Sequence, residues 1–514
     1  MRARAFTRAM TLKLATATAA LLTLGAAPAP TLDADTAAWW RTTAQLSNDS
    51  MEGRDTGSEA YERAAKMVAD RFVAAGLKPA GENGGWFQRV PMHEIRVSRA
   101  SLRAGDRQLA FLHDLTVTPA SAMPARIDAP VAYGGYCAAA TLGDVRGKIV
   151  ICHGTHRAGL PDAAAREAAV RAAGALGMLT IADPGFTVEP PRWPYAYART
   201  VTLATEPRKP DPFLRMTLNA AALGKFVAGS GKNATTLIAA GSRGRPLPSF
   251  AIPSRLRGQF TISERDISAP NVLAYLPGTD PGIRSQAILL SAHLDGYGHG
   301  EPVNGDRIYN GTLDDAAYVA LLIRLAERRK DHAFRRPLLF AAWTGEEKGL
   351  LGSRWFVAHP TTPLGRIAGV INLDQLRPIF PLKLLTVHAL NDTTLGDDAR
   401  AVANGLGIEV QSDPEPERNL LRRTDHWPFM QAGVPGVNFV FGYRPGSRSE
   451  QIYRQWYRTG YHKPQDDLKQ PMDWKAAADF NRFFYKLVER VADQQQRPAW
   501  KPGSSLRASL PVNR

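Results

Sequence analysis

The second half of the chain alternates apolar runs of strand length with helical stretches, and this alternation restricts the fold more than any other feature. Five runs occur, at residues 287–292, 338–343, 367–373, 384–387 and 435–441. They are mainly apolar without a period of two, so each strand must be buried on both faces. Helical stretches such as residues 315–329 separate most of them. The sequence therefore predicts an α/β fold, with a mostly parallel sheet covered by helices on both faces.

The first half of the chain has a different pattern of apolar and polar residues. Residues 30–125 include two helical stretches and are predicted to be the N-terminal part of the same domain. Residues 126–265 combine short β-like runs with an Ala-rich helix and predict a separate, β-rich module. The main domain resumes over residues 266–492. Residues 493–514 are polar, basic and Pro-containing, which predicts a disordered tail.

The N-terminus resembles an export signal. A basic segment precedes the apolar run 14–24, and small residues continue to Ala29, so residues 1–29 are predicted to be a signal peptide. This run is too short for a bilayer anchor. We therefore expect a periplasmic or extracellular protein without stable membrane association; an uncleaved anchor is the alternative. In an oxidising compartment the only two cysteines, Cys137 and Cys152, are expected to form a disulfide.

The formal net charge of +16 raises the question of nucleic acid as a partner. The basic residues are scattered, and no basic stripe is interleaved with aromatic residues. We therefore expect a solvated basic surface and no nucleic-acid binding.

Histidine and carboxylate side chains follow the predicted strands at the point where each strand ends. Ligands of an open parallel sheet bind beyond the carboxyl ends of its strands. The residues found there, or after the loop that follows the last run, are His293, Asp295, Glu346, Glu347, Asp374 and His462. Imidazole and carboxylate without thiolate favour zinc, with cobalt or manganese as substitutes. The sequence therefore predicts a metal site at this edge.

The spacing of these residues suggests separate roles. Asp295 lies two residues after His293, so both side chains would leave a strand on the same face, and Asp295 could hold the second nitrogen of His293. Of the adjacent Glu346 and Glu347, one suits a metal ligand and the other a base that takes the proton from a metal-activated water. Taken alone, the Glu-Glu pair would be a solvated turn.

Together these motifs resemble the di-zinc aminopeptidases, family twenty-eight of the metallopeptidases. The resemblance is carried by Ser291–Asp295, Tyr309–Ala316, Thr344–Ser353, Asn372–Asp374, Thr424–His426 and Tyr461–Asp466. It implies a zinc-exopeptidase-like fold and two zinc ions per chain. It implies Glu346 as the general base, and the metal ligands His293, Asp314, Glu347, Asp374 and His462. Asp314 would bridge the ions. Residues 144–150 and 173–177 resemble the protease-associated domain often inserted in this family.

The implied function is a zinc-dependent aminopeptidase that hydrolyses N-terminal residues from peptides. Arg377, Arg422 and Arg423 favour an alternative, a carboxypeptidase or dipeptidase in which they bind a substrate carboxylate. Surface solvation or ion pairing is the commoner role for such arginines. A glutaminyl-cyclase-like enzyme with one zinc is a second alternative. A non-catalytic binding protein fits less well, because all five ligands and Glu346 are present.

Overall fold

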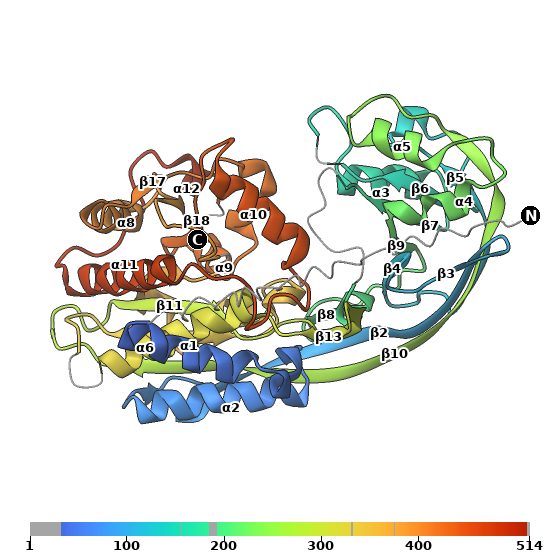
Figure 1. Cartoon of the computed structure of the whole chain (residues 1–514). Helices are drawn as coiled ribbons and strands as arrows, with labels where there is room; N and C mark the ends of the chain where they lie inside the picture. Colours follow the sequence, from blue (N-terminus) through green and yellow to red (C-terminus); the bar gives the residue numbers. More distant parts are fainter. Residues whose placement is uncertain (1–31, 156, 185–192, 330–332, 375, 511–514) are drawn as a thin grey trace, which may run out of the picture.

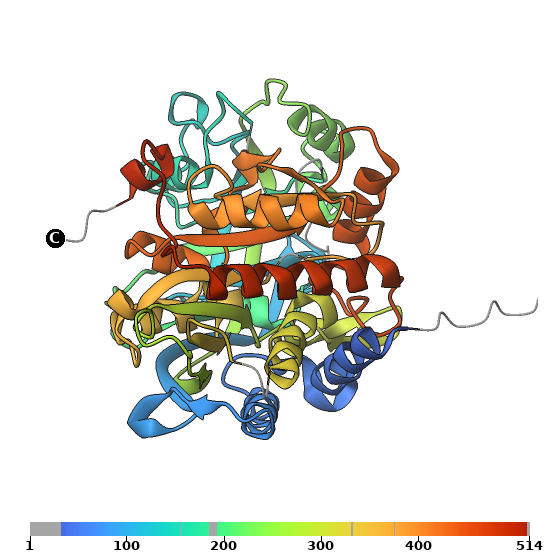
Figure 2. The same ribbon diagram turned by 90° about the vertical axis from the view of Figure 1, so that its left-hand side faces the viewer.

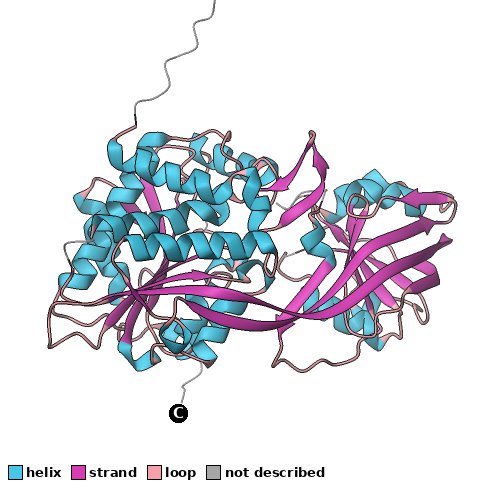
Figure 3. Cartoon of the chain, turned by 90° about the horizontal axis from the view of Figure 1, so that it is seen from below, coloured by secondary structure: helices cyan, strands magenta, loops and turns pink. Residues whose placement is uncertain are grey.

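The computed structural model describes residues 32–510 except residues 156, 185–192, 330–332 and 375. It shows two lobes connected by two long strands (Figure 1). The signal peptide expected at residues 1–29 lies outside this range. The connecting strands are β2 (Phe87–Ala104) and β10 (Phe250–Leu276), which pair antiparallel from one lobe into the other. A view from below shows these strands extending from one lobe into the other (Figure 3). A continuous hydrogen-bond ladder therefore joins the lobes.

The first lobe is built on the predicted sheet. Its strand order is β17-β16-β18-β15-β11-β14-β10, with β15, β11 and β14 adjacent and parallel. The α/β fold is thus confirmed, with β16 antiparallel to β18 and β10 antiparallel to β14. The bounds are β1 (Lys78–Pro79), β11 (Ala287–His293), β14 (Leu338–Trp343), β15 (Ile367–Asn372), β16 (Leu384–His388), β17 (Glu409–Gln411) and β18 (Gly436–Phe441).

Helices cover both faces of this sheet because the strand side chains are apolar in both directions. Ile288 and Leu290 belong to the core under α1, α2, α6, α8 and α11. Leu289 packs in the opposite core, under α7 and α9. An end-on view shows α8 and α11 lying side by side (Figure 2). The helices are α1 (Ala34–Ser47), α2 (Glu59–Ala74), α6 (Ala317–Arg328), α7 (Leu351–Ala358), α8 (Thr394–Gly405), α9 (His426–Gln431), α10 (Arg448–Thr459), α11 (Trp474–Asp493) and α12 (Ser505–Ser509).

The second lobe has its own sheet and hydrophobic cores. Strands β5, β6, β7 and β9 are parallel, with β4 antiparallel at the edge. Its main core includes Val97, Leu109 and Val117, so the lobe begins before the expected boundary at residue 126. The reason is that β2 runs into this lobe. The bounds are β3 (Arg107–Leu109), β4 (Leu115–Thr118), β5 (Arg126–Tyr133), β6 (Ile149–His153), α3 (Ala163–Ala172), β7 (Gly177–Ala182), β9 (Leu214–Asn219), α4 (Leu223–Val227) and α5 (Ala234–Gly241).

Two short features lie at the junction of the lobes. A 3-10 turn, η4 (Tyr195–Ala198), leads into β8 (Arg199–Leu203), which pairs with β2. The hairpin of β12 (Gly298–Val303) and β13 (Asp306–Tyr309) meets η4 through a bridge between Pro194 and Gly300. Across the described part of the chain, no helix is long and apolar enough to cross a membrane.

The C-terminal residues correct one expectation. The prediction of a disordered tail is wrong for residues 494–510, which pack against the first lobe. Trp500 donates a hydrogen bond from its indole nitrogen to the carbonyl of Gly433 at 2.8 Å, and Leu510 is buried beside Met430. Two apolar anchors in a polar segment therefore fix the chain, which average composition did not reveal.

The predicted disulfide between Cys137 and Cys152 is confirmed. Both cysteines lie in a small core of the second lobe. Because the bond closes a loop with a sequence separation of 15, replacing both cysteines by alanine should lower the free energy of unfolding by about 3 kcal/mol. Urea denaturation of this variant measures the change, and wild type reduced with dithiothreitol is the control. An unchanged midpoint in both would contradict the prediction.

Candidate metal centre

The expected ligands converge at the carboxyl ends of adjacent strands. His293 is the last residue of β11, and Asp374 lies two residues after β15. Glu346 and Glu347 form a 3-10 turn after β14. The remaining two come from elsewhere: Asp314 from the turn Thr312–Ala316 that precedes α6, and His462 from the loop after α10.

Three candidate ligand sets form here, and two of them share Asp314. The third joins His293, Glu346 and Glu347. Candidate ligand atoms of His293, Asp314 and Asp374 lie within 4.8 Å of one another, as do those of Asp314, Glu347 and His462. The two carboxylate oxygens of Asp314 face different histidines. Oδ1 lies 3.3 Å from His293 Nε2, and Oδ2 lies 3.5 Å from His462 Nε2. A carboxylate in this position can bridge two neighbouring cations.

The donor atoms fit a metal in their chemistry and their surroundings. His293 is 1% exposed and Asp314 is 4% exposed. Within the described chain, His293 Nε2 and Glu347 Oε1 are buried without a hydrogen-bond partner. Buried polar atoms of this kind are costly unless something else satisfies them. Nitrogen and oxygen donors without thiolate suit zinc.

Asp295 acts through atoms other than those expected. The Nδ1 atom of His293 lies 3.0 Å from the backbone carbonyl of Asp295, while the nearer carboxylate oxygen is 3.8 Å away. The carboxylate instead accepts hydrogen bonds from the backbone N–H groups of Glu346 (3.1 Å) and Glu347 (3.3 Å) and from the Thr56 hydroxyl (3.0 Å). Asp295 therefore fixes one ligand with its carbonyl and the Glu346–Glu347 turn with its carboxylate.

Gly345 allows the chain to turn sharply into Glu346. Its φ is +66°, and a Cβ at this position would lie 2.9 Å from the Cβ of Leu351. Both the backbone conformation and the close approach of α7 therefore favour glycine. His462 also has a left-handed backbone, with φ of +51°, which is uncommon for a residue with a side chain.

A buried arginine lies directly behind the shared ligand. Arg377 is fully buried, and its Nη2 atom lies 3.2 Å from Asp314 Oδ2. Its Nη1 donates to the carbonyls of Leu313 and Leu376. Burial alone would raise the pKa of Asp314, but Arg377 and the two histidines hold this pKa well below its ordinary value. Of the two roles that the sequence favoured for Arg377, ion pairing is correct and surface solvation is wrong.

The two adjacent glutamates have raised pKa values in the metal-free protein. Burial raises the pKa of Glu346 well above its ordinary range; His293 opposes this shift, and the charges of Asp374 and Glu347 add to it. Burial also raises the pKa of Glu347, to about 7. A carboxylate whose pKa is raised in this way is a better proton acceptor than an exposed one.

A pocket of about 480 Å³ opens onto the ligands. Its lining combines Glu346 and ligand residues with aromatic, apolar and basic side chains: Tyr197, Tyr297, Asp314, Glu346, Glu347, Gly349, Leu350, Leu420, Arg422, Arg423, Thr424, Tyr461 and His462. Arg422 and Arg423 are exposed here, and the Arg422 guanidinium lies 5.1 Å from the centre of the Trp427 ring.

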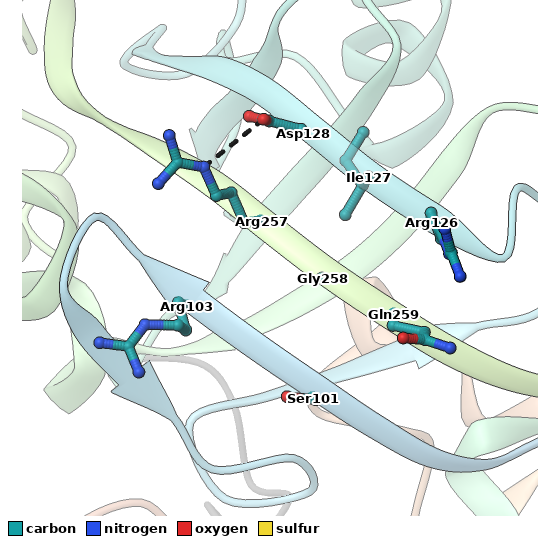
Figure 4. A pocket seen from close by; sticks show the side chains of 8 residues that line it. All are labelled: Ser101, Arg103, Arg126, Ile127, Asp128, Arg257, Gly258 and Gln259. Carbon is teal, nitrogen blue, oxygen red and sulfur yellow. Dashed lines mark ion pairs between the residues drawn. The ribbon is translucent and has the colours of Figure 1, made fainter.

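A larger hollow, of about 630 Å³, lies on the second lobe's sheet (Figure 4). Arg103, Arg257 and Asp128 project there from three neighbouring strands, and Arg257 pairs with Asp128 at 3.5 Å. None of the eight residues that line it is a histidine or cysteine. We therefore place the chemistry at the smaller pocket, where the ligands lie.

Two tyrosines that contact candidate ligands were not predicted from the sequence. The Tyr297 hydroxyl donates to Glu347 Oε2, and the Tyr197 hydroxyl lies 2.8 Å from His462 Nδ1. Tyr297 follows His293 by four residues, so extending that motif would have found it. Tyr197 is 265 residues away from His462 in the chain, and no local pattern marks it.

The fold and the candidate ligand sets define an α/β protein with a histidine–carboxylate site suited to zinc. Residues 271–488, which contain all five candidate ligands and Glu346, match the model described as peptidase family M28. These residues resemble that family, and the match covers less than half of the chain.

Solved structures show the same fold over most of the chain. An aminopeptidase from Aneurinibacillus sp. strain AM-1 covers 91% of this chain and 96% of its own, with a TM-score of 0.58 and 18% identity. A zinc aminopeptidase from Bacillus subtilis covers 91% and 97%, with a TM-score of 0.59 and 16% identity.

Curated relatives match over shorter stretches. Leupeptin-inactivating enzyme 1 of Streptomyces exfoliatus is 26% identical over 40% of this chain and 45% of its own length. The alkaline phosphatase isozyme conversion protein of Escherichia coli K12 is 30% identical over 34% of this chain and 52% of its own length. The chain thus spans about half the length of these two relatives.

Proposed function

We propose that the protein is a zinc-dependent aminopeptidase that removes N-terminal residues from peptides and holds two zinc ions. The observation that carries this proposal is the pair of ligand sets sharing Asp314, with Glu346 at the same pocket. The match of this region to a peptidase family supports it. Similar proteins named as aminopeptidases, among them one from Bacillus subtilis, add support.

Different residues of the site would bind the metal ions and transfer the proton during hydrolysis. Bound zinc would polarise the peptide carbonyl and lower the pKa of a water molecule. His293, Asp314 and Asp374 would hold one ion, and Asp314, Glu347 and His462 the other. Glu346, held by Asp295, accepts the proton from the attacking water and returns it to the leaving amine.

Export and the role of the second lobe are part of the same proposal. We propose that residues 1–29 direct export to the periplasm or the extracellular space, where the Cys137–Cys152 disulfide is stable. We further propose that the inserted lobe is a protease-associated domain that limits access to the pocket. The position of Tyr197 in the pocket wall supports such a role.

A peptide should be shortened from its free amino end, and acetylation of that end should abolish cleavage. The ion that Asp314, Glu347 and His462 would hold offers a position for a neutral amine, which an acetylated nitrogen cannot fill. Amidation of the carboxyl end should have little effect. Mass spectrometry of one peptide in its free, N-acetylated and C-amidated forms measures all three outcomes.

A carboxypeptidase or dipeptidase is the second candidate, because Arg422 and Arg423 line the same pocket. Their guanidinium groups suit a substrate carboxylate. Arg377 does not serve this role, since it is buried against Asp314. Cleavage that survives acetylation but is lost on amidation would replace the aminopeptidase proposal with this one.

A further inference from the structure

In the candidate set of Asp314, Glu347 and His462, the last two residues are each hydrogen-bonded to a different tyrosine. Tyr297 donates to Glu347 Oε2, and Tyr197 lies 2.8 Å from the Nδ1 atom of His462. The two tyrosine rings stack, with centroids 5.2 Å apart and an interplanar angle of 21°. The Tyr297 ring also lies 4.4 Å from that of His462. The two tyrosines therefore pack as one unit against the candidate ligands Glu347 and His462.

Tyr197 comes from the turn η4 at the junction of the two lobes. The second lobe holds this segment through Trp193, which is buried in its core and donates from its backbone N–H to the carbonyl of Leu112 at 3.0 Å. The first lobe holds it through the bridge between Pro194 and Gly300 and through Lys348, whose Nζ lies 3.4 Å from the carbonyl of Ala196. The position of Tyr197 therefore depends on both lobes.

A hydrogen bond at Nδ1 decides how His462 presents its other nitrogen. A histidine binds a cation through a nitrogen without a proton, so Nδ1 must carry the proton when Nε2 is the ligand atom. Nδ1 then donates to the Tyr197 oxygen, which fixes both the tautomer and the ring orientation. In this orientation Nε2 lies 3.5 Å from Asp314 Oδ2 and 3.7 Å from Glu347 Oε2.

We propose that Tyr197 is a positioning residue for the ion held by Asp314, Glu347 and His462, so that the second lobe forms part of the metal centre. This inference rests on the proposed two-zinc centre. It goes beyond a lid that limits access, because it makes the affinity for one ion depend on a side chain at the junction of the lobes.

The test compares Tyr197→Phe with Tyr195→Phe. Both variants lose a hydroxyl from the same turn, but Tyr195 contacts Glu301 and no ligand. Metal-free full-length proteins are titrated with zinc against a chromophoric chelator to obtain two dissociation constants. Tyr197→Phe should raise one constant about 10- to 100-fold and leave the other unchanged, and Tyr195→Phe should change neither. The visible spectrum of the cobalt-loaded protein should change only for Tyr197→Phe.

Two results for the variants would overturn the inference. One is a Tyr197→Phe protein that binds both ions as the wild type does. The other is an equal loss in both variants, which would show a general loosening of the turn. The titration needs no substrate, so a protein that cleaves no peptide but shows the expected difference would reject the proposed activity and support the role of Tyr197. A wild type that binds a single ion would overturn the two-ion centre and this inference with it.

Discussion

Replacing Glu346 with glutamine should lower kcat for peptide hydrolysis by about 10²- to 10⁴-fold while leaving the zinc content unchanged. An amide cannot accept the proton of the attacking water. Both sets that share Asp314 remain intact in this variant, because neither of them includes Glu346. Steady-state kinetics and metal analysis of the same preparation measure the two effects.

The neighbouring Glu347→Gln variant is the matched control. Glu347 belongs to the set with Asp314 and His462, so its replacement should weaken binding of one ion. The two variants should therefore separate loss of turnover from loss of metal. Near-wild-type turnover in Glu346→Gln would reject Glu346 as the base. Loss of metal in Glu346→Gln but not in Glu347→Gln would exchange the two roles.

Replacing Arg377 with methionine should lower the free energy of unfolding of the metal-free protein by about 3–5 kcal/mol. The change leaves the buried carboxylate of Asp314 without the cation that lies 3.2 Å from it. Arg354→Met is the control, because Arg354 pairs with Glu206 at a half-exposed position, where such pairs contribute about 0–1 kcal/mol. Urea denaturation compares the three proteins. Equal stabilities of Arg377→Met and Arg354→Met would contradict this role.

The loss of unfolding free energy in Arg377→Met should depend on pH, and the pKa of Asp314 sets the direction of this dependence. The pKa of Asp314 is held below its ordinary value in the folded protein, so its ionisation stabilises the fold above the unfolded pKa of about 4. This contribution is lost as the pH falls through the folded pKa. The deficit of Arg377→Met should therefore be full near neutrality and become smaller below about pH 4.

The sheet could be predicted from the sequence because each strand is marked by its own local run of apolar residues. The runs that became β11, β14 and β15 are apolar on both faces, and the residues that follow each strand must meet at one edge. Strand order was not needed to group His293, Glu347 and Asp374. Asp314 lies on a turn, and only the resemblance identified it as a ligand. His462 was grouped with the others because it follows the last predicted strand after a loop.

Features that depend on tertiary contacts were not predicted. The atom of Asp295 that meets His293 depends on the loop after β11, which curves so that the carbonyl is nearer than the carboxylate. The burial of Arg377 follows from the packing of Trp456, whose ring its guanidinium contacts at 4.6 Å. Tyr197 reaches the centre from a turn at the junction of the two lobes, which the long strands β2 and β10 connect.

The zinc content of the wild-type protein tests the central claim most directly. The account predicts two zinc ions per chain after zinc loading and removal of excess metal, because Asp314 is shared by two ligand sets. Peptidase activity should reach its maximum only when both sites are filled. Elemental analysis alongside activity during stepwise loading measures this relation. A single bound zinc with activity already maximal would contradict the two-metal centre and favour a cyclase-like enzyme.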